Sequence, residues 1–363
     1  MEKARSLTVP AEAQLTSSMR LRERLRKLRK SYLFRVLVQG IVTIWAVMTF
    51  TFILIRQLPG NPVDIKIEQI IQTQNISYDE AEAQAALLFD FDPDAPLLEQ
   101  YADYVGKLIR GDMGESITSR TPVIDLILRF LPWTLFSVGL GLTISFVLGI
   151  VIGTAMAYWR GSAFDNVMTA FASIMYGIPD FIIALLLLLV AGVQLQLFRV
   201  GDVLGGVDPN LQPGFNPEYI ISLFQHVTLP VITYVTTTIG GWILTMKSST
   251  LSTLGEDYIT VAQARGLSQQ RILVSYVGRN AMLPLVTRLA ISIGFVISGS
   301  VIIETLFIYP GLGRLLIKSI TDRDYTTMQG VFLTIAIAVI VSNILADLMY
   351  GWLDPRVRLG DNT

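Results

Sequence analysis

The stretch "EDYITVAQARGLSQQRILVSYVGRNAMLPLVT", residues 256–287, is polar and charged, yet it lies between two strongly apolar segments. Across the chain, 52% of the residues are hydrophobic and only 16% are charged. A soluble globular chain is less apolar than this. Since a helix needs about 20 apolar residues to cross a bilayer, we predict an all-α polytopic membrane protein with six transmembrane helices. The predicted spans are 33–55, 133–158, 168–191, 226–246, 284–308 and 328–352.

The distribution of charge predicts the orientation of these spans. Basic residues crowd the stretch from Arg20 to Lys30, and the positive-inside rule keeps such a tail in the cytoplasm. The tail either only sets the topology or also contacts anionic lipid. Six spans return the C-terminus to the same side. The expected parts are a basic cytoplasmic tail (1–32), the first transmembrane helix (33–55), an outer helical segment (56–131), a core of five transmembrane helices (132–353) with a cytoplasmic loop (247–283), and a cytoplasmic C-terminal tail (354–363).

Residues 247–283 are the longest expected inner loop and so the part most available to a cytoplasmic partner. The spacing in "DYITVAQA" predicts a helix with Tyr258, Val261 and Ala262 on one side. Gly266 fits the position where a left-handed residue ends a helix, and Ser268 is a candidate N-cap of the next helix. The loop is either a docking element or an ordinary interfacial connector.

The sequence "TVAQARG" at 260–266, with Leu283 and Pro284 after it, resembles the cytoplasmic loop of ABC-importer permeases. The broad pattern there is Glu-Ala-Ala, three residues, Gly, and a later Leu-Pro; Thr260 and Val261 depart from it, and the gap to the proline is longer. Other motifs, in order along the chain, resemble the dipeptide/oligopeptide (peptide/nickel) branch, and the chain is similar to the first of its two paired permeases. These motifs are "LPGNP" (58–62), "GDMGESITSRTPV" (111–123), "ETLFIYPGLGRLL" (304–316), "RDYTTMQG" (323–330) and "LDPRVR" (353–358).

The resemblance implies a type I ABC-importer permease fold in a prokaryotic cell membrane. It implies three kinds of partner besides the bilayer, and no nucleic acid: a second homologous permease, two ATP-binding subunits that use ATP and Mg, and an extracytoplasmic solute-binding protein. The implied cargo is a di- or oligopeptide, with nickel complexes and oligosaccharides left open. The residues it implies for coupling to the ATPase are Ala262, Ala264, Arg265, Gly266, Leu267 and Pro284. The alanines would allow close approach, Arg265 would pair with an acidic group, and Gly266 would supply the bend.

The chain itself is expected to be neither an enzyme nor a cofactor-binding protein. The sequence contains no G-x-x-x-x-G-K-[ST], no G-x-S-x-G and no H-E-x-x-H. The absence of cysteine excludes thiol catalysis and thiolate metal sites. The single histidine, His226, is expected to have a structural role at a membrane boundary. An intramembrane hydrolase is the alternative from another class, and a simple channel would not need a docking loop.

Polar residues in apolar spans are candidates for the solute pathway, because they usually face the bundle interior or a wet cavity. In the fourth span, Thr233, Thr237, Gly241 and Thr245 recur every four residues and share one side of the helix. This stripe either lines the pathway or allows close helix packing. Ser298 in the fifth span faces the partner permease or the pathway. A further pair of small residues, Gly149 and Gly153 in the second span, predicts packing.

Two acidic residues have separate expected roles. Asp180 directly follows Pro179, which is expected to kink the third span. Its carboxylate meets cationic cargo, caps the freed backbone, or lies near the membrane surface. Glu304 is expected to hold the loop after the fifth span through Arg314 or a backbone donor.

In the outer segment, residues 77–89 and 97–109 have helical spacing and predict a small cap that receives a solute-binding protein.

Overall fold

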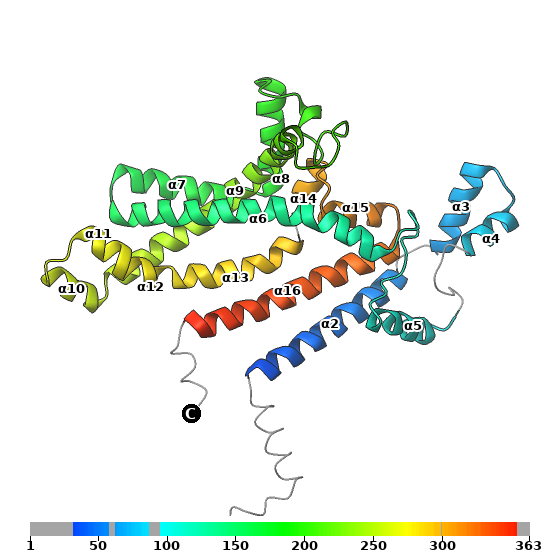
Figure 1. The fold of residues 1–363 in the computed structure, drawn as a ribbon, viewed down its shortest axis with the longest axis horizontal. Helices are drawn as coiled ribbons and strands as arrows, with labels where there is room; N and C mark the ends of the chain where they lie inside the picture. The colour runs from blue at the N-terminus through cyan, green and yellow to red at the C-terminus, as the bar shows by residue number, and fades with distance from the viewer. Residues whose placement is uncertain (1–31, 58–61, 87–94, 299, 354–363) are drawn as a thin grey trace, which may run out of the picture. The chain divides into compact units, whose positions relative to one another are not determined.

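The computed structural model describes residues 32–57, 62–86, 95–298 and 300–353 (Figure 1). Both predicted tails fall outside these ranges, apart from Tyr32. Within the ranges all regular elements are helices, which confirms the all-α fold class. The α-helices are α2 (Tyr32–Arg56), α3 (Pro62–Gln74), α4 (Tyr78–Ala86), α5 (Leu97–Ile109), α6 (Val123–Tyr158), α7 (Ala163–Gly177), α8 (Asp180–Leu186), α9 (Pro217–Leu254), α10 (Asp257–Ala264), α11 (Gln269–Arg271), α12 (Arg279–Ala281), α13 (Leu283–Ser298), α14 (Val301–Leu306), α15 (Leu312–Thr321) and α16 (Tyr325–Leu353); two π-helices, η2 (Leu187–Gln194) and η4 (Ile272–Gly278), and one 3₁₀ helix, η3 (Val200–Asp202), complete the set.

The chain forms two compact units, Met1–Ala46 and Val47–Thr363. The described part of the first unit is the beginning of α2. All other helices belong to the second unit, and every contact discussed below lies within it.

Four described helices are long and apolar enough to cross a membrane, and they match the first, second, fourth and sixth predicted spans. The third predicted span is a pair of helical segments, Ala163–Gly177 and Asp180–Gln194, bent by 103°. The fifth is α13, whose 16 residues extend about 24 Å, followed by the short α14. The chain is therefore polytopic as predicted, but the described residues supply four spanning helices, or five with the bent pair, against the six predicted.

The break in the third span lies at Pro179. Ile178 ends α7 in an extended conformation (φ −86°, ψ 126°), and Pro179 is the N-cap of α8. Proline disfavours the helical conformation of the residue before it and provides no N–H. The helix consequently stops and restarts in a new direction, where the sequence had predicted only a kink.

Two predicted spans extend beyond their apolar cores. α6 begins at Val123 and continues through Pro132, so the preceding segment ends before residue 131. α9 begins after its N-cap Asn216, whose Oδ1 accepts a hydrogen bond from the Tyr219 N–H at 2.7 Å, and it runs to Leu254. Caps and packing set such helix ends, and hydropathy does not report them.

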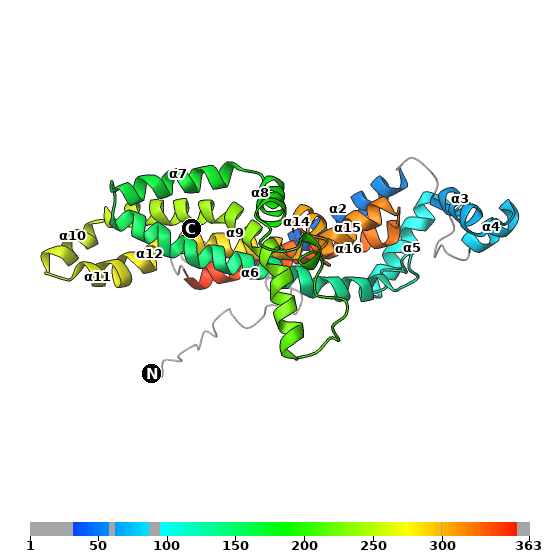
Figure 2. The same ribbon diagram turned by 90° about the horizontal axis from the view of Figure 1, so that it is seen from above.

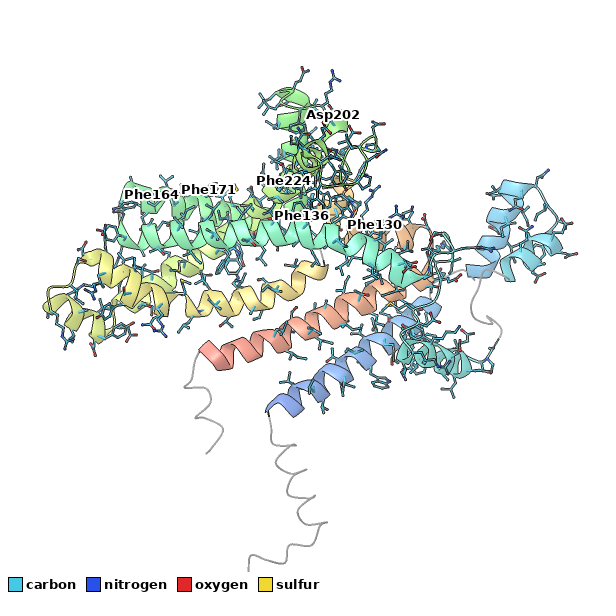
Figure 3. The ribbon with its side chains drawn as sticks, in the orientation of Figure 1. Phe130, Phe136, Phe164, Phe171, Asp202 and Phe224 are labelled. Atoms are coloured by element: carbon cyan, nitrogen blue, oxygen red, sulfur yellow. The ribbon has the colours of Figure 1, made fainter. Side chains whose placement is uncertain are left out.

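α9 is central to the packing, because it lies against both α6 and α7 (Figure 2). A Cβ on Gly149 or Gly153 of α6 would collide with Trp242 or its neighbours in α9. Phe136 of α6 also meets Phe224 of α9 edge-on, with ring centroids 5.8 Å apart (Figure 3). The predicted packing role of the glycine pair is confirmed.

The segment between α2 and α6 contains α3, α4 and α5. The last two confirm the helices predicted in 77–89 and 97–109, while α3 was not predicted. Ile67, Ile70 and Ala81 of α3 and α4 share a core with Tyr325 and Met328 of α16. The segment between α2 and α6 is therefore packed onto the helical core.

The carboxylate of Asp324, which is 2% exposed, ties the start of α16 to the segment before α6. It accepts hydrogen bonds from the Ser116 hydroxyl (2.5 Å), the Ile117 N–H (3.1 Å) and the Thr118 hydroxyl (3.1 Å). It also caps its own helix through the N–H (3.2 Å) and hydroxyl (2.8 Å) of Thr327. Two of the motifs, 111–123 and 323–330, thus meet at one carboxylate.

Glu304 in α14 is buried and organises the loop that leads to α15. Its carboxylate accepts hydrogen bonds from the Thr134 hydroxyl (2.8 Å), the Gly313 N–H (2.7 Å) and the Arg314 N–H (3.2 Å). The Thr134 hydroxyl oxygen in turn accepts the Leu312 N–H at 2.7 Å. The predicted role of Glu304, holding this loop through backbone donors, is confirmed.

Candidate functional site

The polar segment after α9 folds as two helical pieces joined by a left-handed glycine. α10 ends at its C-cap Arg265, and Gly266 follows with φ +74°. The Leu267 N–H donates to the Ala262 carbonyl (3.3 Å) and the Gly266 N–H to the Gln263 carbonyl (2.9 Å). These are the bonds of a Schellman ending, which favours glycine because a Cβ disfavours positive φ. The predicted bend at Gly266 is confirmed.

The second piece starts at Ser268, whose Oγ accepts the Arg271 N–H at 3.4 Å, as predicted for an N-cap. It continues through α11, η4 and α12 to Ala281. The π-helical turn within it, Ile272–Gly278, is a rare geometry that is frequent at functional sites. The segment is thus a bent pair of short helices.

The buried side of α10 includes only Ala262 of the three residues expected to share one side of the helix. Ile259 and Ala262 are 1% and 3% exposed, while Tyr258 and Val261 are 39% and 53% exposed. Ile259 and Ala262 join a core that also contains Leu285 of α13 and residues of α6 and α9. The helical spacing was right, but tertiary packing selected the neighbouring side of the helix.

This geometry separates the predicted coupling residues into two groups. Ala262 was expected to allow the close approach of a partner. In the structure it is buried against its own chain and offers no surface to one. Leu267 is half-buried against the same core. The exposed residues are Ala264, Arg265, Gly266 and Pro284. They form the accessible part of the loop and of the entry to α13.

The predicted stripe on α9 is mostly satisfied within the protein. Thr233 is buried, and its hydroxyl donates to the Leu229 carbonyl at 2.9 Å. Thr237 is half-buried and donates to the Thr233 carbonyl at 3.1 Å. Gly241 is buried beside the Arg288 guanidinium of α13. The side chain of Ser298 is not among those described. Of the stripe, Thr237 and Thr245 are half-buried and so keep the partial exposure that a pathway residue needs.

Arg288 was not singled out from the sequence, although a charged residue in an apolar span is a recognisable signal. Its Nη1 donates to the Gly241 carbonyl (3.2 Å) and the Thr245 hydroxyl (3.1 Å). Its guanidinium carbon lies 4.8 Å from the ring centroid of Trp242, a cation–π distance. A Cβ on Gly241 would lie 2.8 Å from Nη2. The glycine therefore makes room for the arginine that joins α13 to α9.

A second charged contact that the sequence did not indicate joins α7 to α9. Lys247 Nζ lies 2.5 Å from Asp165 Oδ1 and donates to the Thr169 hydroxyl at 2.9 Å. Asp165 also accepts the Gly161 N–H at 3.0 Å. This ion pair lies near the end of α9 that leads into the polar segment.

Asp180 is half-buried at the first position of α8. One oxygen accepts its neighbour's N–H, that of Phe181, at 2.9 Å, and the other accepts the Ser300 hydroxyl at 3.2 Å. Asp180 thus links the break in the third span to the break in the fifth. These contacts satisfy the carboxylate in part, as the capping interpretation requires, and leave it accessible.

A polar cavity of about 600 Å³ lies among the residues that precede and begin α9. It is lined by Asp202 (labelled in Figure 3), Asp208, Glu218 and His226, among others. The Nδ1 atom of His226 is 2.7 Å from the Ser222 carbonyl oxygen. Among the described residues, no group of three or more His, Cys, Asp and Glu is placed to hold a metal ion.

Comparison with known proteins gives one family and several full-length relatives. Residues 149–359 match the family described as binding-protein-dependent transport system inner membrane component. The dipeptide transport system permease protein DppB of Escherichia coli K12 is 33% identical over 343 residues, which cover 90% of this chain and 98% of DppB. The oligopeptide transport system permease protein AppB of Bacillus subtilis is 30% identical, covering 90% and 99%.

A solved structure shows a similar fold. An inward-facing conformation of the MetNI methionine ABC transporter matches with a TM-score of 0.50 and 16% identity, covering 64% of this chain and 97% of that one. At this identity the likeness concerns the fold alone. It agrees with the predicted type I permease fold.

Proposed function

The chain belongs to the family of binding-protein-dependent transport system inner membrane components, and from this we propose that it is the permease of an importer of di- or oligopeptides. The observation that supports the cargo is the similarity over nine-tenths of the chain to permeases named for dipeptide and oligopeptide transport. Nickel complexes and oligosaccharides, the alternative cargoes, are not favoured by these names. The chain has a transport role rather than an enzymatic one.

The proposed importer contains a second permease, two ATP-binding subunits that hold ATP and Mg, and an extracytoplasmic solute-binding protein. The family description names a binding protein, and the structural neighbour is an ABC transporter. We place α10 to α12 and both termini on the cytoplasmic side, because of the basic residues before α2. The segment between α2 and α6 then lies outside, where it would meet the solute-binding protein.

The polar segment is proposed as the coupling element that an ATP-binding subunit moves. Ala264, Arg265 and Gly266 are exposed and available to a partner. On its other side α10 buries Ile259 in a core shared with Leu285 of α13. A displacement of α10 would therefore act on two spans at once, α9 and α13.

For the solute pathway we propose Asp180, Thr237 and Ser298, at the broken or polar parts of the spans. Thr233 and Gly241 are buried. We propose that they shape the pathway through helix packing and do not line it. The Asp180–Ser300 hydrogen bond supports the proposal, because it joins two interrupted helices. Interrupted helices are the usual place for solute sites within a membrane.

The cargo is tested with the complete transporter in lipid vesicles. Uptake of a labelled dipeptide should depend on ATP and on the solute-binding protein, and an unlabelled tripeptide should compete with it. A nickel chelate or an oligosaccharide that competed better than every peptide would overturn the peptide assignment.

The coupling role is tested by two alanines of the same helix. Because the chain has no cysteine, Ala264→Cys introduces one exposed thiol, and Ala262→Cys introduces one buried thiol as the matched control. A short bifunctional thiol reagent should join Ala264→Cys, but not Ala262→Cys, to cysteines placed on the ATP-binding subunit. Equal yields from the two positions, or none from Ala264→Cys, would contradict the docking role.

A further inference from the structure

The helix α5, in the segment between α2 and α6, has two chemically distinct exposed sides. Leu98 and Ile109 are 79% and 81% exposed, and Leu97 is also exposed. Glu99 and Asp103 are exposed about a quarter turn or more away from Leu98. A helix with an apolar side and a charged side, both uncovered, is typical of the membrane–water boundary.

α5 is anchored to the last turns of α2, a helix long and apolar enough to span the membrane (Figure 1). The Tyr101 hydroxyl is 2.6 Å from the Thr49 hydroxyl. The ring of Phe52 lies 5.3 Å from that of Tyr101 and 5.5 Å from that of Tyr104. Tyrosine is enriched at the membrane boundary, where its ring and hydroxyl meet different surroundings. These contacts fix the depth of α5 relative to α2.

The residue of α2 that Tyr101 contacts lies inside the apolar span and not beyond its end. The span runs to Leu54, so Thr49 lies five residues inside it, which is about 7.5 Å along the helix axis. Interfacial helices bury their apolar side about 5–10 Å into the boundary between headgroups and acyl chains. The start of α5 therefore lies at the level of acyl chains and not in water.

A groove of about 410 Å³ separates α5 from α2 at this level. Its walls are apolar except for the hydroxyls of Thr49 and Tyr101 and the amide of Gln57. Ile53 lines it and is itself 48% exposed on the span. The groove thus opens onto the exposed apolar side of α2, which is the side that would face lipid in a membrane.

We propose that α5 is an interfacial helix, with Leu97, Leu98 and Ile109 among the acyl chains of one leaflet, and that a lipid acyl chain fills the groove between α5 and α2. The charged side, with Glu99 and Asp103, then faces the headgroups and water. A protein partner is a different occupant of the same surface, and the experiment separates the two.

Single cysteines carry a nitroxide label in the assembled transporter, reconstituted in phosphatidylethanolamine and phosphatidylglycerol vesicles. Leu98→Cys and Ile109→Cys report on the apolar side, Ile53→Cys on the groove, and Glu99→Cys is the matched control one residue away. Electron paramagnetic resonance measures collisions with oxygen, which concentrates in lipid, and with a water-soluble nickel chelate. The complex with the unsubstituted chain is the background control, because any nitroxide on it must be attached to cysteines of the other subunits.

Lipid contact predicts collisions with oxygen that exceed those with the chelate several-fold at Leu98, Ile109 and Ile53, and the reverse at Glu99. Equal access of the chelate to Leu98 and Glu99 would overturn the proposal, because α5 would then stand in water. Protection of Leu98 and Ile53 from both reagents would also overturn it, because protein would then cover this side. All four positions are exposed, so the labels need no rearrangement of the core.

Discussion

Replacing Gly266 by proline should uncouple ATP hydrolysis from transport. Proline fixes φ near −65°, whereas Gly266 has φ +74°. Proline also removes the N–H that donates to the Gln263 carbonyl at 2.9 Å. The left-handed conformation costs an ordinary L-residue about 1–2 kcal/mol, which is a lower bound for proline because its ring excludes positive φ, and losing the hydrogen bond costs about 1 kcal/mol. The bent geometry should then be disfavoured by at least about 2–3 kcal/mol, which reduces its population by at least about 30- to 150-fold.

Uptake of labelled peptide should fall by a comparable factor in Gly266→Pro, while the variant still inserts into the membrane and assembles. No atom lies within 4 Å of a Cβ built on Gly266, so the effect is one of backbone conformation and not of packing. Gly266→Asn should keep most of the uptake, because asparagine tolerates the left-handed region. Gly255→Ala, in the same segment, is the neutral control because its φ is −82°. Wild-type uptake by Gly266→Pro, or equal loss in Gly255→Ala, would refute this reasoning.

Three further predictions concern topology, cargo and stability. Ser77→Cys should react with an impermeant thiol reagent added outside while Ser268→Cys is shielded; the opposite pattern would reverse the orientation. Asp180→Asn should change the uptake of cationic relative to neutral peptides with the complex intact, and unchanged uptake of every peptide would remove it from the pathway. Asp324→Asn should lower the melting temperature, since an amide nitrogen would face donors in a buried site and cost about 1–3 kcal/mol, whereas the exposed Asp322→Asn should not.

Local chemistry made several features predictable from the sequence. The bend at Gly266 and the N-cap at Ser268 depend on a few adjacent residues, and the structure has both. The apolar spans were recognisable because bilayer thickness sets their length. The loop-holding role of Glu304 was also predictable, because a carboxylate beside a glycine-rich turn has backbone donors within reach.

Other features depend on contacts between distant residues, which no local pattern encodes. Ser116 and Asp324 are 208 positions apart, so their hydrogen bond was not visible in either motif. The burial of Ile259 in place of Val261 was decided by the surfaces of α9 and α13. Arg288 carried a signal, its charge within an apolar span, but its partners on α9 did not follow from it.

The buried side of α10 also leads to a prediction about force transmission. Ile259 is 1% exposed in the core shared by α9, α10 and α13, and close-packed interiors transmit displacement. Ile259→Ala would remove this contact at a cost of about 2–5 kcal/mol, loosening α10 from the spans while leaving its exposed side intact. ATP hydrolysis should therefore persist while peptide uptake per ATP falls severalfold. Val261→Ala is the matched control, because Val261 is 53% exposed and adds little to that core. A parallel loss of hydrolysis and uptake in Ile259→Ala, or an equal defect in Val261→Ala, would contradict force transmission through the buried side of α10.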